Sequence, residues 1–374
     1  MDQYNRYGNQ YGTQYGGYNP AYYGGQQYGG SPQGDPFIII QQQKKDEKRG
    51  LFKNAAKLGA LLIIYEILTT ALAYAYYYVL YFVKEGSFTL SFSKVKSYFR
   101  ANPEIMNSSF YKMLGNLSIV LTSLVILLVI AVLVFKVDLR PMLKPGKEEI
   151  VGGTKWFSLS MSVNVAVSIV VSIIMIILST AGITVPESDF SMSDSNTGTL
   201  IMQFLYVVLL GPICEEVIYR GIIITLLKPY GKGLALFFSA FIFGFMHGNI
   251  PQFASAFAGG LVFAAIAVKY DSIIPTMVMH IMNNILASIS DFAEVMDVDI
   301  DLAHNIYYGI VIICAVVGMY MLFVNIKDLK PVEEKTFLLT SGERRRAVFF
   351  NIIMLIYLGW TFVGYITSII SSNR

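Results

Sequence analysis

Two carboxylates and a guanidinium lie inside an apolar stretch, in the segment GPICEEVIYRG at residues 211–221. Ionisable groups in hydrocarbon cost several kcal/mol each unless they are paired or hydrated, so they are candidates for function. Glu216 and Arg220 are four residues apart, and on a helix they can form an ion pair on one face. Glu215 is rotated by roughly 100° from Glu216 and can point elsewhere. A buried pair by itself fits a structural clamp, but a second carboxylate beside it indicates chemistry.

Histidine and asparagine side chains follow at helical spacing further along the chain. His247 ends one apolar run, while His280 and Asn284 are four residues apart in another and share a helix face. Counted at about 1.5 Å per residue, Glu215, His247 and His280 reach similar depths near the membrane midplane. Pro212 is expected to kink the helix beside the glutamates. We therefore expect these helices to line a common cavity. The structural alternative is that their polar side chains only hydrogen-bond one helix to another.

The elements that must position these residues are membrane helices. Hydrophobic residues make up 55% of the 374 positions and charged residues only 14%, which is outside the usual range of soluble proteins. Apolar runs of about 18 residues or more predict membrane spans. Six such runs are 58–83, 114–135, 157–177, 200–227, 306–326 and 347–370. Three shorter runs, 234–246, 253–268 and 273–289, are counted as spans because the alternation of charged loops requires them. The prediction is an all-α polytopic membrane protein with about nine transmembrane helices.

The distribution of Lys and Arg predicts the orientation, because these residues accumulate in cytoplasmic loops. Five basic residues between positions 44 and 53 precede the first span and place the N-terminus in the cytoplasm. The loops 182–199, 248–252 and 290–305 contain no Lys or Arg and are expected on the opposite side. The loop 84–112 disagrees, because it carries five basic residues on the side predicted to be external. The net charge of +3 is thus a topology signal and not a nucleic-acid patch. We predict a multi-pass protein of the bacterial plasma membrane, the bacterial source being suggested by the style of the tail.

Residues 1–50 differ in composition from the rest. Residues 1–36 repeat Tyr-Gly and Gln-Gly with almost no aliphatic side chain, so they cannot bury a core and are predicted to be disordered. The charged collar KKDEKR follows them. We therefore divide the chain into a cytoplasmic tail with its collar, 1–50, and one membrane domain, 51–374. Glu66 lies alone in the first span, and we expect it at a helix interface rather than in catalysis.

Three motifs in chain order carry a family resemblance. EEVIYR fits the pattern EExxxR, FGFMH fits FxxxH and HIMNN fits HxxxN. On successive spans these motifs resemble the CAAX prenyl endopeptidase and bacteriocin-processing family, the CPBP or Abi intramembrane proteases. The resemblance covers residues 200–290, which would form the catalytic core. Each motif alone is weak, but three in this order at membrane depth are specific.

The resemblance implies an intramembrane endopeptidase with defined residue roles. Glu215 would be the general base that activates water, and His247 would help to hold that water. His280 and Asn284 would polarise the scissile carbonyl and stabilise its oxyanion. A desolvated carboxylate is a stronger base, and preformed donors in a water-poor site contribute a few kcal/mol at the transition state. The supporting positions would be Glu216, Arg220 and Phe243.

A zinc-dependent version of the same protease is the alternative mechanism. One Glu and two His match a catalytic zinc ligand set, and here these would be Glu215, His247 and His280. Glu216 would then have to act as the base, which conflicts with its pairing to Arg220. The preferred mechanism is therefore metal-free and needs no cofactor.

Two other classes of protein use similar residues. A proton- or ion-coupled transporter could employ the same buried carboxylates, but transporters usually show two halves with similarly interrupted helices, and this sequence does not. A membrane scaffold without catalysis would interact through its Tyr-Gly tail. For the protease, the expected partners are a membrane-associated peptide or protein substrate, including lipidated ones, and the lipid bilayer, with no nucleic acid.

Overall fold

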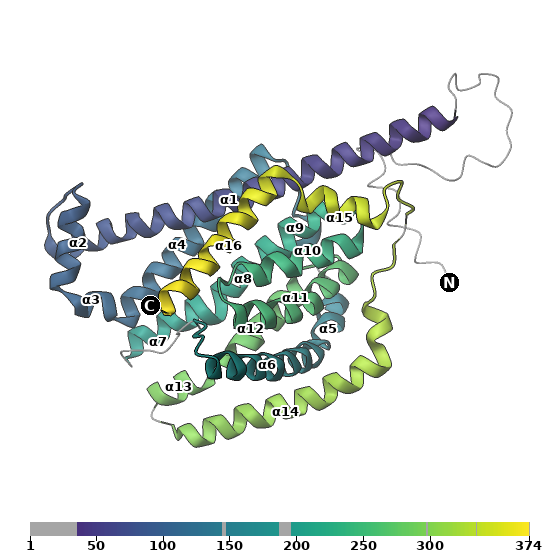
Figure 1. Ribbon diagram of the computed structural model, residues 1–374. Coiled ribbons are helices and arrows are strands. Elements are labelled where there is room, and N and C mark those ends of the chain that lie inside the picture. The colour runs from purple at the N-terminus through teal and green to yellow at the C-terminus, as the bar shows by residue number, and fades with distance from the viewer. Residues whose placement is uncertain (1–35, 144–146, 187–195, 297, 334, 374) are drawn as a thin grey trace. The chain divides into compact units, whose positions relative to one another are not determined.

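The computed structural model describes residues 36–143, 147–186, 196–296, 298–333 and 335–373, and each regular element within these ranges is helical (Figure 1). The predicted all-α polytopic class is confirmed. The chain divides into two units, 1–43 and 44–374. The described residues of the first unit are the start of helix α1, and the second unit holds everything discussed below. The predicted disorder of the tail concerns residues that lie, apart from Pro36, outside the described ranges.

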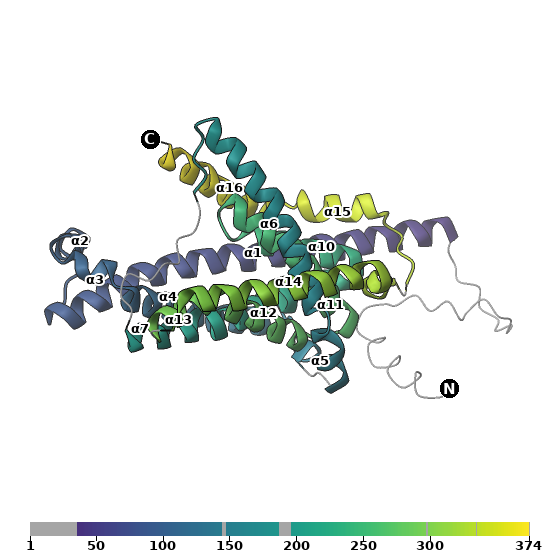
Figure 2. The ribbon, with the colours of Figure 1, turned by 90° about the horizontal axis from the view of Figure 1, so that it is seen from below.

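The first helix is longer than the sequence indicated. Helix α1 (Pro36–Glu85) is 50 residues long and runs through the charged collar without a break. Residues 36–50, which we grouped with the tail, are therefore helical and continuous with the first span. Two short helices, α2 (Phe92–Ala101) and α3 (Pro103–Asn107), then lie at the end of α1 in both views (Figures 1 and 2).

The remaining helices follow in chain order, with π and 3₁₀ segments labelled η. They are α4 (Ser109–Val129), η2 (Ile130–Val134), η3 (Pro141–Leu143), α5 (Lys147–Thr154), α6 (Phe157–Thr180), α7 (Thr197–Gln203), η4 (Phe204–Leu210), α8 (Gly211–Glu216), η5 (Val217–Ile222), α9 (Ile223–Leu227), η6 (Lys228–Tyr230), α10 (Lys232–Phe245), α11 (Ile250–Tyr270), α12 (Ile274–Ala287), α13 (Ile289–Val295), α14 (Ile300–Asn325), η7 (Ile326–Leu329), α15 (Ser341–Phe349) and α16 (Ile352–Ser372).

The centre of the second unit is a stack of helices. Helix α10 packs against α11, α11 against α6, and α6 against α14 (Figure 1). Gly244 permits the close approach of α10 to α11, because a Cβ atom at this position would lie 2.9 Å from the carbonyl oxygen of Phe253. The largest buried apolar cluster includes residues of α8, η5 and α10, so the helices of the first two motifs are also part of the core.

Seven helical segments in the described part of the chain are long and apolar enough to cross a membrane. The nine predicted spans are therefore not confirmed. The run 253–268 extends to the 21 residues of α11, but α10 and α12 have only 14 residues each. Much of α10 is buried against other helices, and a helix enclosed by protein need not cover the whole hydrocarbon thickness. The cytoplasmic placement of the N-terminus and the bacterial membrane stay predictions.

Candidate active site

The helix with the two glutamates is interrupted on both sides of them. Helix α8 carries Glu215 and Glu216 and lies between the π-helical segments η4 and η5. Pro212 stands in the first turn of α8, where its missing N–H is tolerated. The N–H of Gly211 reaches back five residues to the carbonyl of Tyr206. π-Helical turns inside helices are frequent at functional sites, and here they set the direction in which the carboxylates leave the helix.

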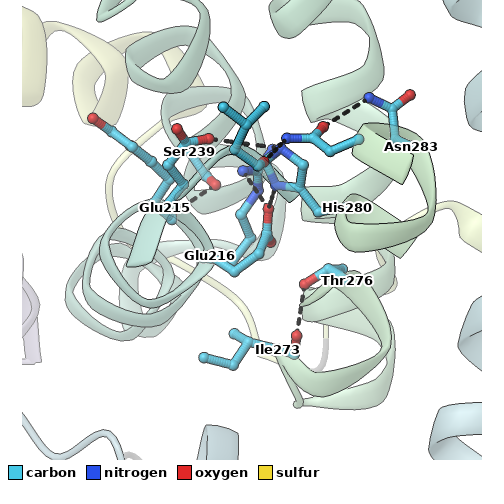
Figure 3. A network of polar contacts seen from close by, with 11 residues as sticks. Glu215, Glu216, Ser239, Ile273, Thr276, His280 and Asn283 are labelled. Atoms are coloured by element: carbon cyan, nitrogen blue, oxygen red, sulfur yellow. Dashed lines mark hydrogen bonds and ion pairs between the residues drawn. The ribbon is translucent and has the colours of Figure 1, made fainter. Parts of the chain in front are cut away.

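Glu216 is the centre of a buried polar network (Figure 3). Its Oε1 accepts a hydrogen bond from Nη1 of Arg220 at 2.9 Å, and Nδ1 of His280 lies 2.9 Å from the same oxygen. The side chains of Glu216 and Arg220 are fully buried, and that of His280 is 9% exposed. The predicted pairing of Glu216 with Arg220 is present, and the structure adds His280 as a third member. Breaking a buried pair of this kind typically costs about 3–5 kcal/mol, so Glu216 is fixed in place.

Glu215 faces the other side of the same imidazole. Its Oε2 lies 3.6 Å from Nε2 of His280, just beyond hydrogen-bond distance. The Glu215 side chain is 29% exposed whereas Glu216 is fully buried. Because the Glu216 carboxylate accepts from Nδ1, it orients the ring so that Nε2 points towards Glu215. One carboxylate thus holds the histidine, and the other is accessible.

Phe243, which lies on helix α10, packs against the network. The guanidinium carbon of Arg220 lies 4.1 Å from the centre of the Phe243 ring and 5.5 Å from that of Phe263. These cation–π contacts partly compensate for burying the charge. The Phe243 ring also meets the His280 ring edge-on at 5.8 Å. Gly260 leaves space for this arrangement, because a Cβ there would lie 3.2 Å from both Arg220 Nη2 and Phe243 Cδ1.

His247 is not part of the hydrogen-bonded network. It follows the end of α10, and its Nδ1 is 2.9 Å from the carbonyl oxygen of Phe243 in its own helix. Its ring contacts the Phe243 ring edge-on at 5.2 Å. Among the described residues, no hydrogen bond or ion pair joins His247 to Glu215 or His280. The two histidines thus share a neighbour, Phe243, without touching a common polar group.

Asn284 ties helix α12 to the helix of the glutamates. Its Nδ2 donates to the backbone carbonyl of Val207 in η4 at 2.7 Å, and its Oδ1 accepts from Asn283 at 3.2 Å. One amide hydrogen and the oxygen are therefore engaged with protein. This hydrogen bond joins α12, which carries His280, to η4, which precedes the helix of the glutamates.

Several neighbours of the site were not predicted. Phe263 and Gly260 lie against Arg220, and Tyr65 and Tyr206 lie within electrostatic range of Glu215. The Gly-Gly pair in the apolar run of α11 was the one available signal, since small residues mark close helix contacts in membranes. No feature of the sequence indicated that Tyr65 or Tyr206 would lie near the site. Glu66 contributes no hydrogen bond or ion pair to the network formed by the described residues.

The zinc ligand set is not assembled in this arrangement. Within the described ranges, no group of three or more His, Cys, Asp or Glu side chains is placed to hold a metal ion. His280 and His247 each direct Nδ1 to a protein oxygen, and Nε2 of His280 faces Glu215 at 3.6 Å. We therefore derive no catalytic step through a metal.

One comparison with known proteins gave a match. Residues 197–286 match the family model described as type II CAAX prenyl endopeptidase Rce1-like. The matched segment runs from the first residue of α7 to the last residue but one of α12, and it contains all seven motif residues. The family predicted from the motifs is confirmed for this segment. No curated protein and no solved structure matches the chain.

Proposed function

We propose that this protein, whose residues 197–286 match a family of membrane proteases, is an intramembrane endopeptidase that hydrolyses a peptide bond with water activated by Glu215. The matched family is named for prenylated CAAX substrates. We extend this to a membrane-associated peptide or protein, lipidated ones included, as the substrate class of this chain.

The difference between the two glutamates carries the proposal. Glu216 holds Arg220 and His280 and has no exposed surface, so it is not free to take a proton from a water molecule. Glu215 is 29% exposed and faces His280. A general base must reach the proton that it removes, and hydrogen bonds that are long in a resting site can tighten when substrate binds. Glu215 meets this requirement and Glu216 does not.

The proposed reaction follows from these positions. Glu215 removes a proton from water, and the water oxygen attacks the scissile carbonyl carbon. The resulting oxyanion accepts a hydrogen bond from Nε2 of His280, whose ring lies between two carboxylates. The oxyanion then re-forms the carbonyl as the C–N bond breaks, and Glu215 delivers its proton to the nitrogen of the leaving amine. We assign Arg220 to fixing Glu216 and Asn284 to positioning α12.

Glu215→Gln is the decisive variant. It keeps the size of the side chain but removes the base, and we expect cleavage to fall by roughly 10²–10⁴-fold, the usual contribution of general base catalysis. The assay is cleavage of a prenylated peptide reporter, or of a co-expressed membrane peptide library, by the purified full-length protein. His280→Ala is expected to give a loss of similar size.

Glu66→Gln is the matched control, because it neutralises another carboxylate in an apolar helix that lies outside the network. It should cleave at the rate of the unchanged protein, and all variants should elute as one monodisperse species in detergent. Unchanged cleavage by Glu215→Gln would overturn the proposal. Solute flux through reconstituted vesicles without any cleavage would favour the transporter instead.

The same assay tests the zinc alternative. We expect a chelator such as 1,10-phenanthroline to leave cleavage unchanged. Loss of cleavage with the chelator, recovered by added Zn²⁺ and accompanied by zinc in elemental analysis of the purified protein, would establish the metal-dependent mechanism.

A further inference from the structure

The loop that disagreed with the predicted orientation is a folded segment. Residues 84–112 contain five basic and two acidic side chains, and they form α2 and α3 between the two spanning helices α1 and α4 (Figure 2). Topology signals are carried by short basic loops on the cytoplasmic side. Positive charge on the opposite side needs another explanation.

A groove of about 320 Å³ lies between the last third of α1 and helix α2. Aromatic side chains form most of its walls: Tyr74 meets Phe92 with ring centres 6.1 Å apart, and Tyr77 meets Phe99 at 5.8 Å. The volume is at the lower end of the range for small-molecule sites. It is sufficient for part of a lipid but not for a folded partner.

Two basic side chains border this groove. Lys96 and Arg100 both line it, and as i and i+4 neighbours on α2 they lie on the same face. Both residues are exposed. In the part of the chain that the structure describes, neither forms an ion pair with a carboxylate. Their charge is therefore available to an anion beside an apolar surface.

The surroundings of the groove place it at the boundary of the lipid. Phe88, Leu90 and Phe92 are 73%, 82% and 53% exposed, which is unfavourable for a loop in water. Segments in which exposed Phe or Leu side chains accompany Lys and Arg are typical of the membrane interface. Tyrosines are also enriched at that level, and Tyr74, Tyr77 and Tyr78 line the groove from α1.

We propose that this groove binds an anionic phospholipid, with the lipid phosphate at Lys96 and Arg100 and the glycerol and upper acyl chain against Tyr74, Tyr77 and Phe92. The two basic side chains favour an anionic headgroup because their charges are complementary to it. The aromatic walls favour contact with the acyl chain of the lipid. The inference does not depend on the proposed protease activity. It also gives two of the five basic residues of the loop, Lys96 and Arg100, a role in lipid binding.

Lipid retention by the full-length protein tests the proposal. The purified protein is equilibrated in detergent with equal amounts of phosphatidylglycerol and phosphatidylcholine, and the lipids that stay bound are counted by native mass spectrometry. A basic residue near an anionic lipid is worth roughly fivefold in binding. We therefore expect the protein to prefer phosphatidylglycerol by about tenfold or more, and Lys96→Gln/Arg100→Gln to lose about tenfold of this preference.

Two control variants separate the parts of the site. Arg345→Gln/Arg346→Gln removes the same charge from exposed positions of α15 and should keep the preference. Tyr74→Ser/Phe92→Ser should lower the retention of both lipids and leave the preference between them. All variants must unfold at the temperature of the unchanged protein to be compared.

Three results would overturn the proposal. They are equal retention of the two lipids by the unchanged protein, an unchanged preference in Lys96→Gln/Arg100→Gln, and full retention of both lipids by Tyr74→Ser/Phe92→Ser. The last would mean that the headgroup is held by charge alone and that the groove takes no part.

Discussion

The polar network around Glu216 and the basic groove beside α2 differ in how their charged side chains are compensated. In the network, Glu216 and Arg220 are fully buried and bonded to each other. In the groove, Lys96 and Arg100 are exposed and border aromatic walls. A buried charge must be compensated by protein, since removing its partner leaves it in a medium of low dielectric. An exposed charge is compensated by solvent and can exchange that solvent for a ligand.

Substitutions in the network and at the groove should therefore affect different properties of the protein, its stability and its ligand binding. Substitutions in the network should change how well the protein folds, and they change activity partly through folding. Substitutions at the groove should leave folding alone and change only what binds there. Glu215 is the informative exception, because it belongs to the network by position but is partly exposed, and we expect its loss to affect catalysis alone.

Arg220→Met should have the largest effect on stability. It leaves Glu216 buried with His280 as its remaining partner, and we expect the free energy of unfolding to fall by about 3–5 kcal/mol. Unfolding of the detergent-solubilised protein followed by circular dichroism measures this.

The double variant Glu216→Gln/Arg220→Met sharpens that prediction. Because it removes both charges, it should be more stable than Arg220→Met alone. If the double variant is the less stable of the two, the pair is not a compensated buried charge and the comparison with the groove fails.

Gly260→Ala tests the packing that supports the network. The added Cβ would lie 3.2 Å from both Arg220 Nη2 and Phe243 Cδ1, so these side chains must shift, at a cost of about 1–3 kcal/mol. Gly309→Ala in α14 is the matched control, since a Cβ there has no heavy atom within 4 Å. That variant should be neutral or slightly stabilising, as is usual for Gly to Ala within a helix. Equal stability of the two variants would show that the space beside Arg220 is not limiting.

Asn284→Ala distinguishes positioning from direct catalysis. Loss of its hydrogen bond to the Val207 carbonyl should cost about 1 kcal/mol of stability and reduce cleavage by less than tenfold. An oxyanion donor would instead cost about 10²–10³-fold in cleavage with stability unchanged. Thermal unfolding and reporter cleavage measured on the same preparation decide between the two roles.

Lys96→Gln/Arg100→Gln should have the smallest effect on stability. Substitutions at exposed positions usually stay within about 0.5 kcal/mol, and neither side chain borders a buried carboxylate. Unfolding in detergent without added lipid measures this. A loss of more than 1 kcal/mol would show that these residues hold α2 in place, and the contrast with Arg220 would then be one of degree.

The sequence predicted the parts of the site that depend on local spacing. The pairing of Glu216 with Arg220 follows from four residues of helix, and the three motifs identified the family segment to within a few residues of the matched range 197–286. The divergent directions of Glu215 and Glu216 follow from the turn of the helix in the same way. The count of spans was less well predicted, because α10 and α12 are helices of only 14 residues each, and much of α10 is buried against other helices.

The contacts between helices could not be predicted. His280 meets Glu216 across 64 positions of sequence, and Asn284 meets the Val207 carbonyl across 77. Both depend on how α12 is rotated and raised against the helix of the glutamates. His247 was expected at a shared water, which stays a prediction. Its Nδ1 bonds to the carbonyl of Phe243 in its own helix, which could not be predicted; α10 ends two residues before His247, and the chain turns at Gly248 with a φ of 74°.

The sequence by itself therefore determined the class of the protein, the helices that carry ionisable groups and the pairs that one helix can form. The tertiary structure alone decided which glutamate is fixed in place, which imidazole nitrogen faces which carboxylate, and that Lys96 and Arg100 of loop 84–112 border an aromatic groove. The physical reason is that spacing along a helix fixes only the directions of side chains relative to their own axis. The rotation and depth of one helix against another come from packing, here through small residues such as Gly244 and Gly260, and packing is a property of the whole bundle.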